Sequence, residues 1–351
     1  MSAASQLNIS LLLVQQVLTR YDYPLIFLLG DFGNILNIFL FLRRRLRNTS
    51  CNIYFLASAF TNLVALNVGI ISLLYVYEQP SAVTLTYCKT RNYVLNISQQ
   101  ASRFLIVLAC FDRFALCSTS AGLRKVCQVH IALRYIIPSI IVIWMIIPLH
   151  IPISYSISKN TCIFPGMMVL YNGIYGITMA GLLPPGLMLT FSLLIYRNLK
   201  LKQIRRRQQI YPLVNNASVN PRIRRQQIKD QQALAMLLIQ VVIYVSSTTL
   251  YTTNLMYTVL TMNDAANKSS ERKAIETFAS FIAGILVFVC PCLSFYSFTL
   301  ASRLFRKELR LMMCHLCNGR WHWSCLTRSN RNDTTSNAVA APNAITQPRM
   351  T

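Results

Sequence analysis

The sequence predicts an all-α protein, a bundle of seven helices that cross a membrane. Three observations lead to this prediction. The chain of 351 residues is 54% hydrophobic and only 13% charged, about half the charged fraction of an average soluble domain. Its apolar residues form seven runs of about 20 residues or more, the length that a helix needs to cross a bilayer. Its basic residues gather in alternate loops between these runs, as they do in membrane proteins.

Several of the runs are interrupted by proline, at Pro148, Pro152, Pro184, Pro185 and Pro291 among others. In order, the predicted helices are Tyr23–Leu42, Asn52–Tyr77, Asn92–Cys117, Ile131–Tyr155, Met168–Tyr196, Ala233–Leu260 and Ala274–Leu300. Membrane helices tolerate proline because neighbouring groups satisfy the carbonyls that it frees. We therefore expect an N-terminal segment over residues 1–22, a membrane domain over residues 23–311 and a tail over residues 312–351. The tail is rich in Ser, Thr and Asn, and such polar segments are typically disordered.

The distribution of basic residues predicts the orientation of the chain. Four arginines lie in the loop after the first run, and ten basic residues lie between the fifth and sixth runs. Loops rich in Lys and Arg stay in the cytoplasm, so the N-terminus is expected outside the cell, in a multi-pass protein of the plasma membrane. No cleavable leader is expected, and the first run would act as a signal anchor. Asn8, in an Asn-Ile-Ser sequon, is then a glycosylation acceptor.

The net charge of +24 does not indicate nucleic-acid binding. A nucleic-acid-binding domain gathers its basic residues on one face of a soluble fold. Here they are scattered between apolar runs, and contact with the lipid bilayer explains them without further assumption.

The third run ends on an acid–base pair. Asp112 and Arg113 lie in the segment LACFDRFALCS, and Cys88 precedes Arg113 by 25 residues. At about 1.5 Å per residue, this helical separation is roughly 37 Å, slightly more than a bilayer core. One helix therefore carries a cysteine near its outer end and a charged pair near its inner end.

In these features the chain resembles the rhodopsin-like (class A) G-protein-coupled receptors. The landmarks recur in order: Asn34 before ILNIFLF, the segment NIYFLASAFTNL, Cys88, Asp-Arg-Phe in place of the commoner Asp-Arg-Tyr, Trp144, Pro184–Pro185, and SRLFRKEL. The last segment resembles the short amphipathic eighth helix of this family. The resemblance covers Tyr23 to Leu311 and implies that Asn34, Trp144 and Pro185 serve helix packing.

The resemblance also implies roles for the two ends of the third helix. In the family, the arginine equivalent to Arg113 is freed from its acidic neighbour on activation and contacts a heterotrimeric G protein. Phe114 replaces a tyrosine and loses only a hydroxyl, so we expect little effect. The resemblance further implies a disulfide between Cys88 and Cys162. The alternative for Arg113 is an arginine that snorkels to the membrane surface.

The chain departs from the family at three places. Asn62 stands where an aspartate usually helps to bind sodium, and a neutral amide lacks the charge that a cation site needs. The sixth run contains no proline. The seventh run has PCLSFYSF, in which Ser294 stands near the usual asparagine and Tyr296 is expected to replace the usual tyrosine.

Two further charges lie inside predicted helices, Asp31 and Arg103. Charges at such depth are costly and usually face the interior of the bundle. The favoured hypothesis is that Arg103 organises a polar network with Asn67, Asn254 or Ser294. The alternative is that Arg103 contacts a ligand or a counter-ion, with Asp31 as one candidate.

The segment CHLCNGRWHWSC has cysteine and histidine spacings that loosely resemble a zinc site. Its last interval is shorter than usual, so no metal or other cofactor is expected. S-palmitoylation of Cys314 and Cys317 is the preferred interpretation, and unmodified cysteines are the alternative.

Candidate ligand contacts lie near the outer ends of the second and seventh helices. Glu78 and Glu276 would offer acceptors to a cationic ligand, and the alternative is that they are solvated rim charges. The outer half of the third helix carries Val94, Leu95 and Ile97 and no acid, which disfavours an amine. A peptide ligand is expected, and the resemblance extends to invertebrate neuropeptide receptors of the FMRFamide type.

Three classes of function fit a seven-helix membrane protein. The favoured one is a G-protein-coupled receptor. A transporter or channel is the alternative, but such proteins commonly show repeated halves or several charges along a pathway, and the sequence shows neither. An enzyme is not expected, because the four histidines form no motif and no paired carboxylates share a helix face.

Overall fold

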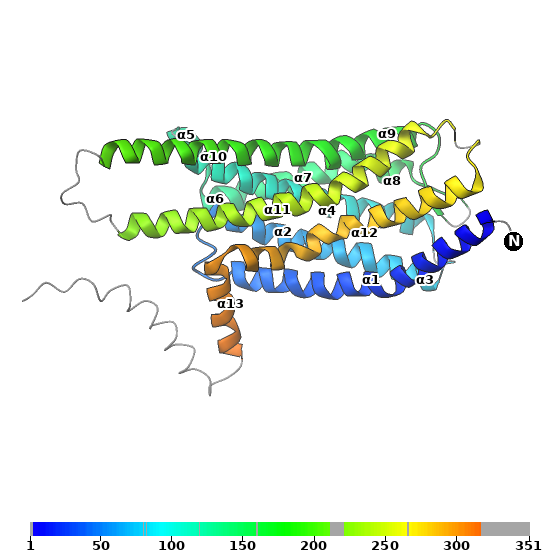
Figure 1. Ribbon diagram of the computed structural model, residues 1–351, viewed down its shortest axis with the longest axis horizontal. Helices are drawn as coiled ribbons and strands as arrows, with labels where there is room; N and C mark the ends of the chain where they lie inside the picture. Colours follow the sequence, from blue (N-terminus) through cyan, green and yellow to red (C-terminus); the bar gives the residue numbers. More distant parts are fainter. Residues whose placement is uncertain are drawn as a thin grey trace, which may run out of the picture. The chain divides into compact units, whose positions relative to one another are not determined.

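The computed structural model describes residues 3–79, 81, 83–118, 120–158, 161–210, 221–264 and 267–316. The chain divides into two units, Met1–Ser302 and Arg303–Thr351. The first unit is a helical bundle with one short hairpin, which confirms the predicted fold class (Figure 1). Within the described residues, seven helical segments are long and apolar enough to cross a membrane: Gln6–Phe41, Ser50–Glu78, Leu85–Cys117, Val129–Ser154, Met168–Leu201, Leu234–Leu260 and Ser270–Ala301.

The elements of the bundle follow the predicted order of runs. They are α1 (Ala3–Phe41), α2 (Ser50–Leu66), η1 (Asn67–Ile71), α3 (Ser72–Glu78), α4 (Leu85–Cys117), α5 (Ala121–Val126), α6 (Val129–Ile131), η3 (Ala132–Ile136), α7 (Ile137–Ile146), η4 (Ile147–Leu149), α8 (His150–Ser154), β1 (Ser156–Ser158), β2 (Thr161–Ile163), α9 (Met168–Gly176), η5 (Ile177–Leu182), α10 (Leu183–Ile210), α11 (Pro221–Leu260) and α12 (Ser270–Ala301).

The helix α1 begins 20 residues before the predicted start at Tyr23. The segment from Ala3 to Asp22 contains no glycine or proline, so nothing in it interrupts a helix. Its apolar residues, among them Leu12 and Leu13, are exposed. Because hydropathy reports the membrane-crossing part and not the whole helix, the sequence placed the boundary too late.

The hairpin and its disulfide mark one end of the bundle. The strands β1 and β2 pair antiparallel, with Ile157 opposite Cys162. Cys162 forms a disulfide with Cys88, which lies in the first turns of α4, after the N-cap Thr84. We call this end the disulfide end and the opposite end, where Asp112 and Arg113 lie, the DRF end.

The helix α4 is the central element of the bundle, and it packs against α2, α10 and α7. On the α7 side, Trp144 is buried with Ala101 and Tyr175, and its ring centroid lies 4.7 Å from that of Phe104. This position agrees with the packing role that the resemblance implied for Trp144.

In the part of the bundle that the structure describes, the segments η1, η3 and η5 are wound as π-helix. Such widened turns are common at functional sites and at irregularities in a helix. The segment η5 directly precedes Pro184 and Pro185, of which Pro184 is buried and Pro185 is half-buried. At η1, a Cβ on Gly69 would lie 2.5 Å from Phe288, so only glycine allows this close approach.

The second unit contains α13 (Arg303–Leu316), in the segment where the eighth helix was expected. Phe305, Leu309 and Met312 recur at helical spacing, and basic residues stand between them, a pattern typical of a helix that lies on a membrane surface. Cys314 lies in the last turn of α13. Cys317 and most of the segment considered for zinc lie outside the described residues, so palmitoylation stays a prediction.

Candidate functional site

The DRF end carries a buried ion pair. The side chains of Asp112 and Arg113 are only 2% and 7% exposed, and Arg113 Nη2 lies 3.4 Å from Asp112 Oδ2. Ser50, the first residue of α2, donates a hydrogen bond to Asp112 Oδ1. The carboxylate therefore joins the arginine of its own helix to the start of α2.

Cys127 reinforces this junction from the loop after α5. Its thiol lies 3.6 Å from the carbonyl oxygen of Asp112, to which it donates. Burial, together with the negative charge of Asp112, raises the pKa of the Cys127 thiol to about 12. The thiol is therefore protonated at neutral pH and stays a donor, and it is a poor nucleophile because the thiolate is the reactive form.

Phe114 belongs to an aromatic cluster that joins α4 to α10. Its ring centroid lies 5.8 Å from that of Phe191, and the Phe111 ring lies 5.5 Å from the same Phe191 ring. The residue that replaces the usual tyrosine thus has a packing role that needs no hydroxyl.

A buried polar network crosses the bundle between α1, α2, α4 and α12. Asn62 Nδ2 donates to Asn34 Oδ1 at 3.2 Å, and Ser102 Oγ donates to Asn62 Oδ1 at 2.5 Å. Ser294 Oγ donates to Asn34 Oδ1 at 3.2 Å. The structure therefore brings together Asn34, Asn62 and Ser294. The amide of Asn62 is engaged on both sides, and it offers no negative charge to a cation.

Tyr296 lies apart from this network. Its hydroxyl donates to the carbonyl oxygen of Leu29 at 3.2 Å, on the exposed side of α1. Phe298 is buried in this turn, and its ring lies 4.7 Å from Phe55 and 5.7 Å from Phe41. The expectation that Tyr296 replaces the usual tyrosine is therefore corrected, because the inward-facing position holds a phenylalanine.

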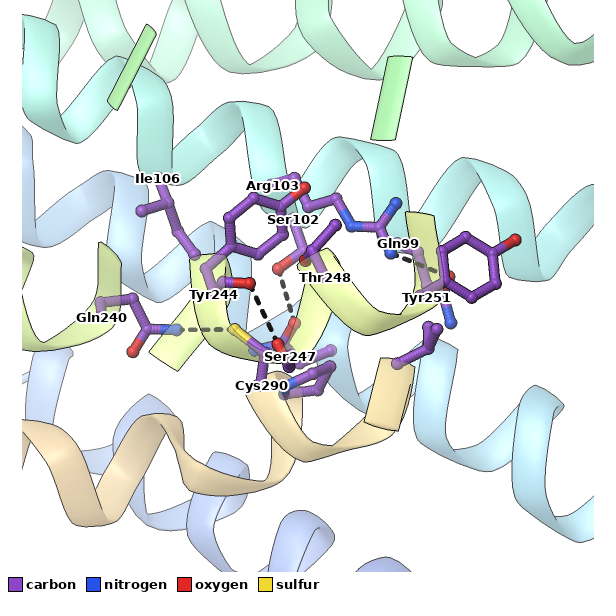
Figure 2. Close-up of a pocket in the computed structure, with 13 residues that line it drawn as sticks. Gln99, Ser102, Arg103, Ile106, Gln240, Tyr244, Ser247, Thr248, Tyr251 and Cys290 are labelled. Atoms are coloured by element: carbon purple, nitrogen blue, oxygen red, sulfur yellow. Dashed lines mark hydrogen bonds between the residues drawn. The ribbon is translucent and has the colours of Figure 1, made fainter. Parts of the chain in front are cut away.

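Arg103 lies in the middle of the bundle with partners other than those expected. Its Nη1 donates to Gln100 Oε1 at 3.2 Å and its Nη2 donates to Gln99 Oε1 at 3.4 Å. Its guanidinium carbon lies 5.8 Å from the centroid of the Tyr244 ring. These groups border a small cavity between α4, α11 and α12 (Figure 2).

The residues proposed as partners of Arg103 are engaged elsewhere. Asn67 donates to Asp31 Oδ2 at 2.8 Å, Asn254 donates to Ser280 at 3.1 Å, and Ser294 belongs to the network around Asn34. Asp31 thus has a neutral partner on the neighbouring helix and does not pair with Arg103.

At the disulfide end, Glu276 is part of an ion cluster. Its carboxylate pairs with Lys268 at 2.7 Å and with Arg272 at 3.0 Å, and it accepts a hydrogen bond from the Tyr257 hydroxyl at 2.7 Å. Glu276, which was expected to offer an acceptor to a cationic ligand, is thus already paired with two cations of the chain, and its role at a ligand rim stays a prediction. Glu78 ends α3 and is exposed.

An open groove of about 510 Å³ lies beside this ion cluster, between α11 and α12. Its size falls within the range of small-molecule sites. Its polar and charged lining residues are Thr253, Asn254, Tyr257, Ser269, Glu271, Arg272 and Glu276. The groove thus offers donors, acceptors and both signs of charge.

Sequence reasoning missed several of the residues that build these sites. Ser50 holds Asp112. Gln240 accepts from Ser297 at 3.1 Å and donates to Cys290 at 3.3 Å. Arg91 donates to the carbonyl oxygen of Gly69 at 3.0 Å. The one available signal was the presence of polar side chains inside otherwise apolar runs.

Comparison with known proteins identifies the architecture. No curated protein matches the chain. The sequence pattern of the family described as "7 transmembrane receptor (rhodopsin family)" matches residues 33–304. The match begins in α1, includes the ion pair, the disulfide and the polar network, and covers well over half of the chain. The chain belongs to the rhodopsin family of seven-transmembrane receptors.

Proposed function

We propose that this receptor binds a peptide at its disulfide end, outside the cell, and activates a heterotrimeric G protein through its DRF end, inside the cell. The observation that carries the proposal is the buried Asp112–Arg113 pair, which is held to α2 by Ser50. A receptor of this family needs an element with two arrangements, one closed and one offered to a partner.

The geometry of the pair suits such a switch. The separation of 3.4 Å between Arg113 and Asp112 is longer than a strong charge-assisted hydrogen bond. The ion pair would thus stabilise the closed state and still be weak enough to break on activation. Breaking the pair would free the guanidinium for a G protein, and Asp112 would keep its bond to Ser50.

The proposed orientation follows from charge. Arg43, Arg44 and Arg45 follow α1 at the DRF end, and loops rich in arginine stay in the cytoplasm. The N-terminus with Asn8 and the hairpin with Cys162 would then face the outside of the cell, in the plasma membrane. A disulfide on that side suits its oxidising environment.

Support for a peptide ligand comes from the outer half of the bundle. The groove between α11 and α12 is open and mixes both signs of charge with amide and hydroxyl groups. The central cavity holds only about 20 Å³, roughly the space of one water molecule. A ligand with many polar groups spread over a rim fits this surface better than a compact amine. A short neuropeptide of the FMRFamide kind is the class to test first.

Replacing Asp112 with asparagine tests the switch without a known ligand. We expect Asp112→Asn to raise ligand-independent nucleotide exchange, because an amide keeps the hydrogen bond from Ser50 but no longer attracts Arg113. Hydrogen bonds to charged groups contribute about 1.5–3 kcal/mol, so the open state should gain on the order of tenfold or more in population. The measurement is GTPγS binding to G protein in membranes that contain equal amounts of receptor.

The matched control is Asp31→Asn, which removes another carboxylate bonded within the membrane-crossing helices without touching the DRF end. Its basal exchange should equal that of the wild type. A similar rise in both variants would show that the effect is a general loosening of the bundle and would contradict the switch.

A peptide screen tests the ligand class. Cells that express the receptor should give a calcium or cyclic-AMP response to a member of a library of short peptides. Arg272→Gln should weaken that response by roughly tenfold, because Arg272 lines the groove and orders Glu276 and Tyr257. Basal exchange, measured in the same cells, should not change. Activation by amines or lipids alone would exclude a peptide.

A further inference from the structure

Arg103 lies deep within the helical bundle. It precedes Arg113 by ten residues and follows Cys88 by fifteen, distances of roughly 15 Å and 22 Å along α4. A guanidinium at this depth is costly, and arginines in membrane segments normally pair with an acid or with backbone carbonyls. The partners of Arg103 therefore need an explanation.

All its partners are neutral. The two glutamine bonds use two of the five N–H donors of the guanidinium, and the Tyr244 ring adds a cation–π contact. Among the described residues, no acid forms an ion pair with Arg103. By contrast, Arg113 and Arg272 each pair with a carboxylate. Among the described residues, the positive charge of Arg103 is thus without a carboxylate partner, as is that of Arg91, which bonds Ser72 and the carbonyl oxygen of Gly69; of the two, only Arg103 borders the central cavity.

The cavity beside Arg103 is lined by polar groups without a carboxylate. Besides Arg103, Cys290 and apolar side chains, its lining residues are Asn62, Gln99, Ser102, Gln240, Tyr244, Ser247, Thr248 and Tyr251. In the view of Figure 2 the guanidinium lies between the Tyr244 and Tyr251 rings, with Thr248 beside it. The volume of this cavity is about 20 Å³, which admits one particle of roughly the size of a water molecule.

The charge of Arg103 and the lining and volume of the cavity together determine the charge and size of a ligand that would fit. A cation would be repelled by Arg103. A water molecule would leave the charge uncompensated in a region of low dielectric, where charges interact strongly. A small monovalent anion would neutralise the guanidinium and accept hydrogen bonds from hydroxyl groups.

We propose that Arg103 and the donors around it form a binding site for one small monovalent anion in the centre of the bundle. A free halide such as chloride and the carboxylate of a ligand share this chemistry. By joining α4 to α11, the bound anion stabilises the closed arrangement of these helices. The site is separate from the groove at the disulfide end, and its test does not depend on the ligand or the G protein.

The test is the thermal stability of the purified receptor in different sodium salts at equal ionic strength. Chloride or formate is expected to raise the unfolding temperature, relative to gluconate, by on the order of 2–4 °C in a saturable manner. A response to chloride assigns the site to free halide. A response to formate alone assigns it to a ligand carboxylate.

Variants separate the site from a general salt effect. Arg103→Met should abolish the anion dependence, and Arg103→Lys should keep part of it because the charge remains. Arg91→Gln is the matched control: it removes another intramembrane arginine, one that bonds Ser72 and Gly69, and should lower stability without changing the response to anions.

Thr248→Val provides a second variant in case Arg103→Met does not fold, and it should weaken the anion response. Equal stability of the wild-type receptor in chloride, formate and gluconate would overturn the proposal. So would an anion response that persists in Arg103→Met.

Discussion

Arg113→Ala is expected to abolish receptor-driven nucleotide exchange, lowering it at least tenfold to the level of membranes without receptor. The guanidinium is the only cationic group of the Asp112–Arg113 pair and, in the proposed mechanism, the group offered to the G protein. Its side chain is 7% exposed, so the closed state shields it and only the open state can present it. The measurement is GTPγS binding in the Asp112→Asn background, in which basal exchange is high.

The control must distinguish a loss of coupling to the G protein from a loss of folded receptor. Removing one partner of a buried ion pair leaves an uncompensated charge and costs about 3–5 kcal/mol, so the single variant Arg113→Ala is expected to be less stable. The double variant Asp112→Asn/Arg113→Ala leaves no charge behind and should reach the cell surface at the level of Asp112→Asn. High exchange in the double variant would contradict the role of Arg113.

The helices could be predicted because the bilayer imposes one length and one composition on each crossing. Many ends of the membrane-crossing segments lie within a few residues of their predicted positions, as at Cys117, Met168 and Leu260. The ends that lie in polar segments could not be predicted, because such segments continue a helix without any hydropathy signal. The predicted sixth helix begins at Ala233, whereas α11 begins at Pro221. The π-helical turns were not predicted, and neither was the close approach of Phe288 to Gly69 in η1.

Residues of the candidate site could be predicted where they belong to a short motif. They were harder to predict where the rotation of a helix determines which side chains come into contact. Asp112 and Arg113 stand in a short motif, and the pairing of Cys88 with Cys162 was implied by the resemblance to the rhodopsin-like receptors. The partners of Arg103 were sought on other helices, although Gln99 and Gln100 stand four and three residues earlier, on the same face of α4.

Tyr296 illustrates the same point within a single turn. It follows Ser294 by two residues, and two residues rotate a helix by about 200°. Because Ser294 faces Asn34, Tyr296 must face away from the network. Phe298, four residues after Ser294, returns to the inner face. The helical spacing of these three residues alone would have placed Tyr296 on the outer face. The prediction failed because it required a tyrosine at the position that in fact holds Phe298.

Loss of the disulfide is expected to lower the free energy of unfolding by about 2–5 kcal/mol. The bond joins Cys88 and Cys162 over a sequence separation of 74 residues, and closing a long loop restricts the unfolded chain strongly. The variant Cys88→Ser/Cys162→Ser should therefore unfold at a lower temperature and reach the cell surface in smaller amounts. Thermal unfolding of the purified receptor and surface labelling measure the two effects.

A reducing agent provides the internal control. Dithiothreitol should lower the stability of the wild-type receptor to that of the double variant and leave the double variant unchanged. Equal stability of the wild-type receptor and the double variant would contradict this prediction and would mean that other contacts hold the hairpin in place. The candidates are the ring pairs of Phe164 with Tyr155, at 4.1 Å, and with His150, at 6.4 Å. Aromatic pairs contribute about 0.5–1.5 kcal/mol each, less than the disulfide, so the covalent bond should dominate the stability of the disulfide end.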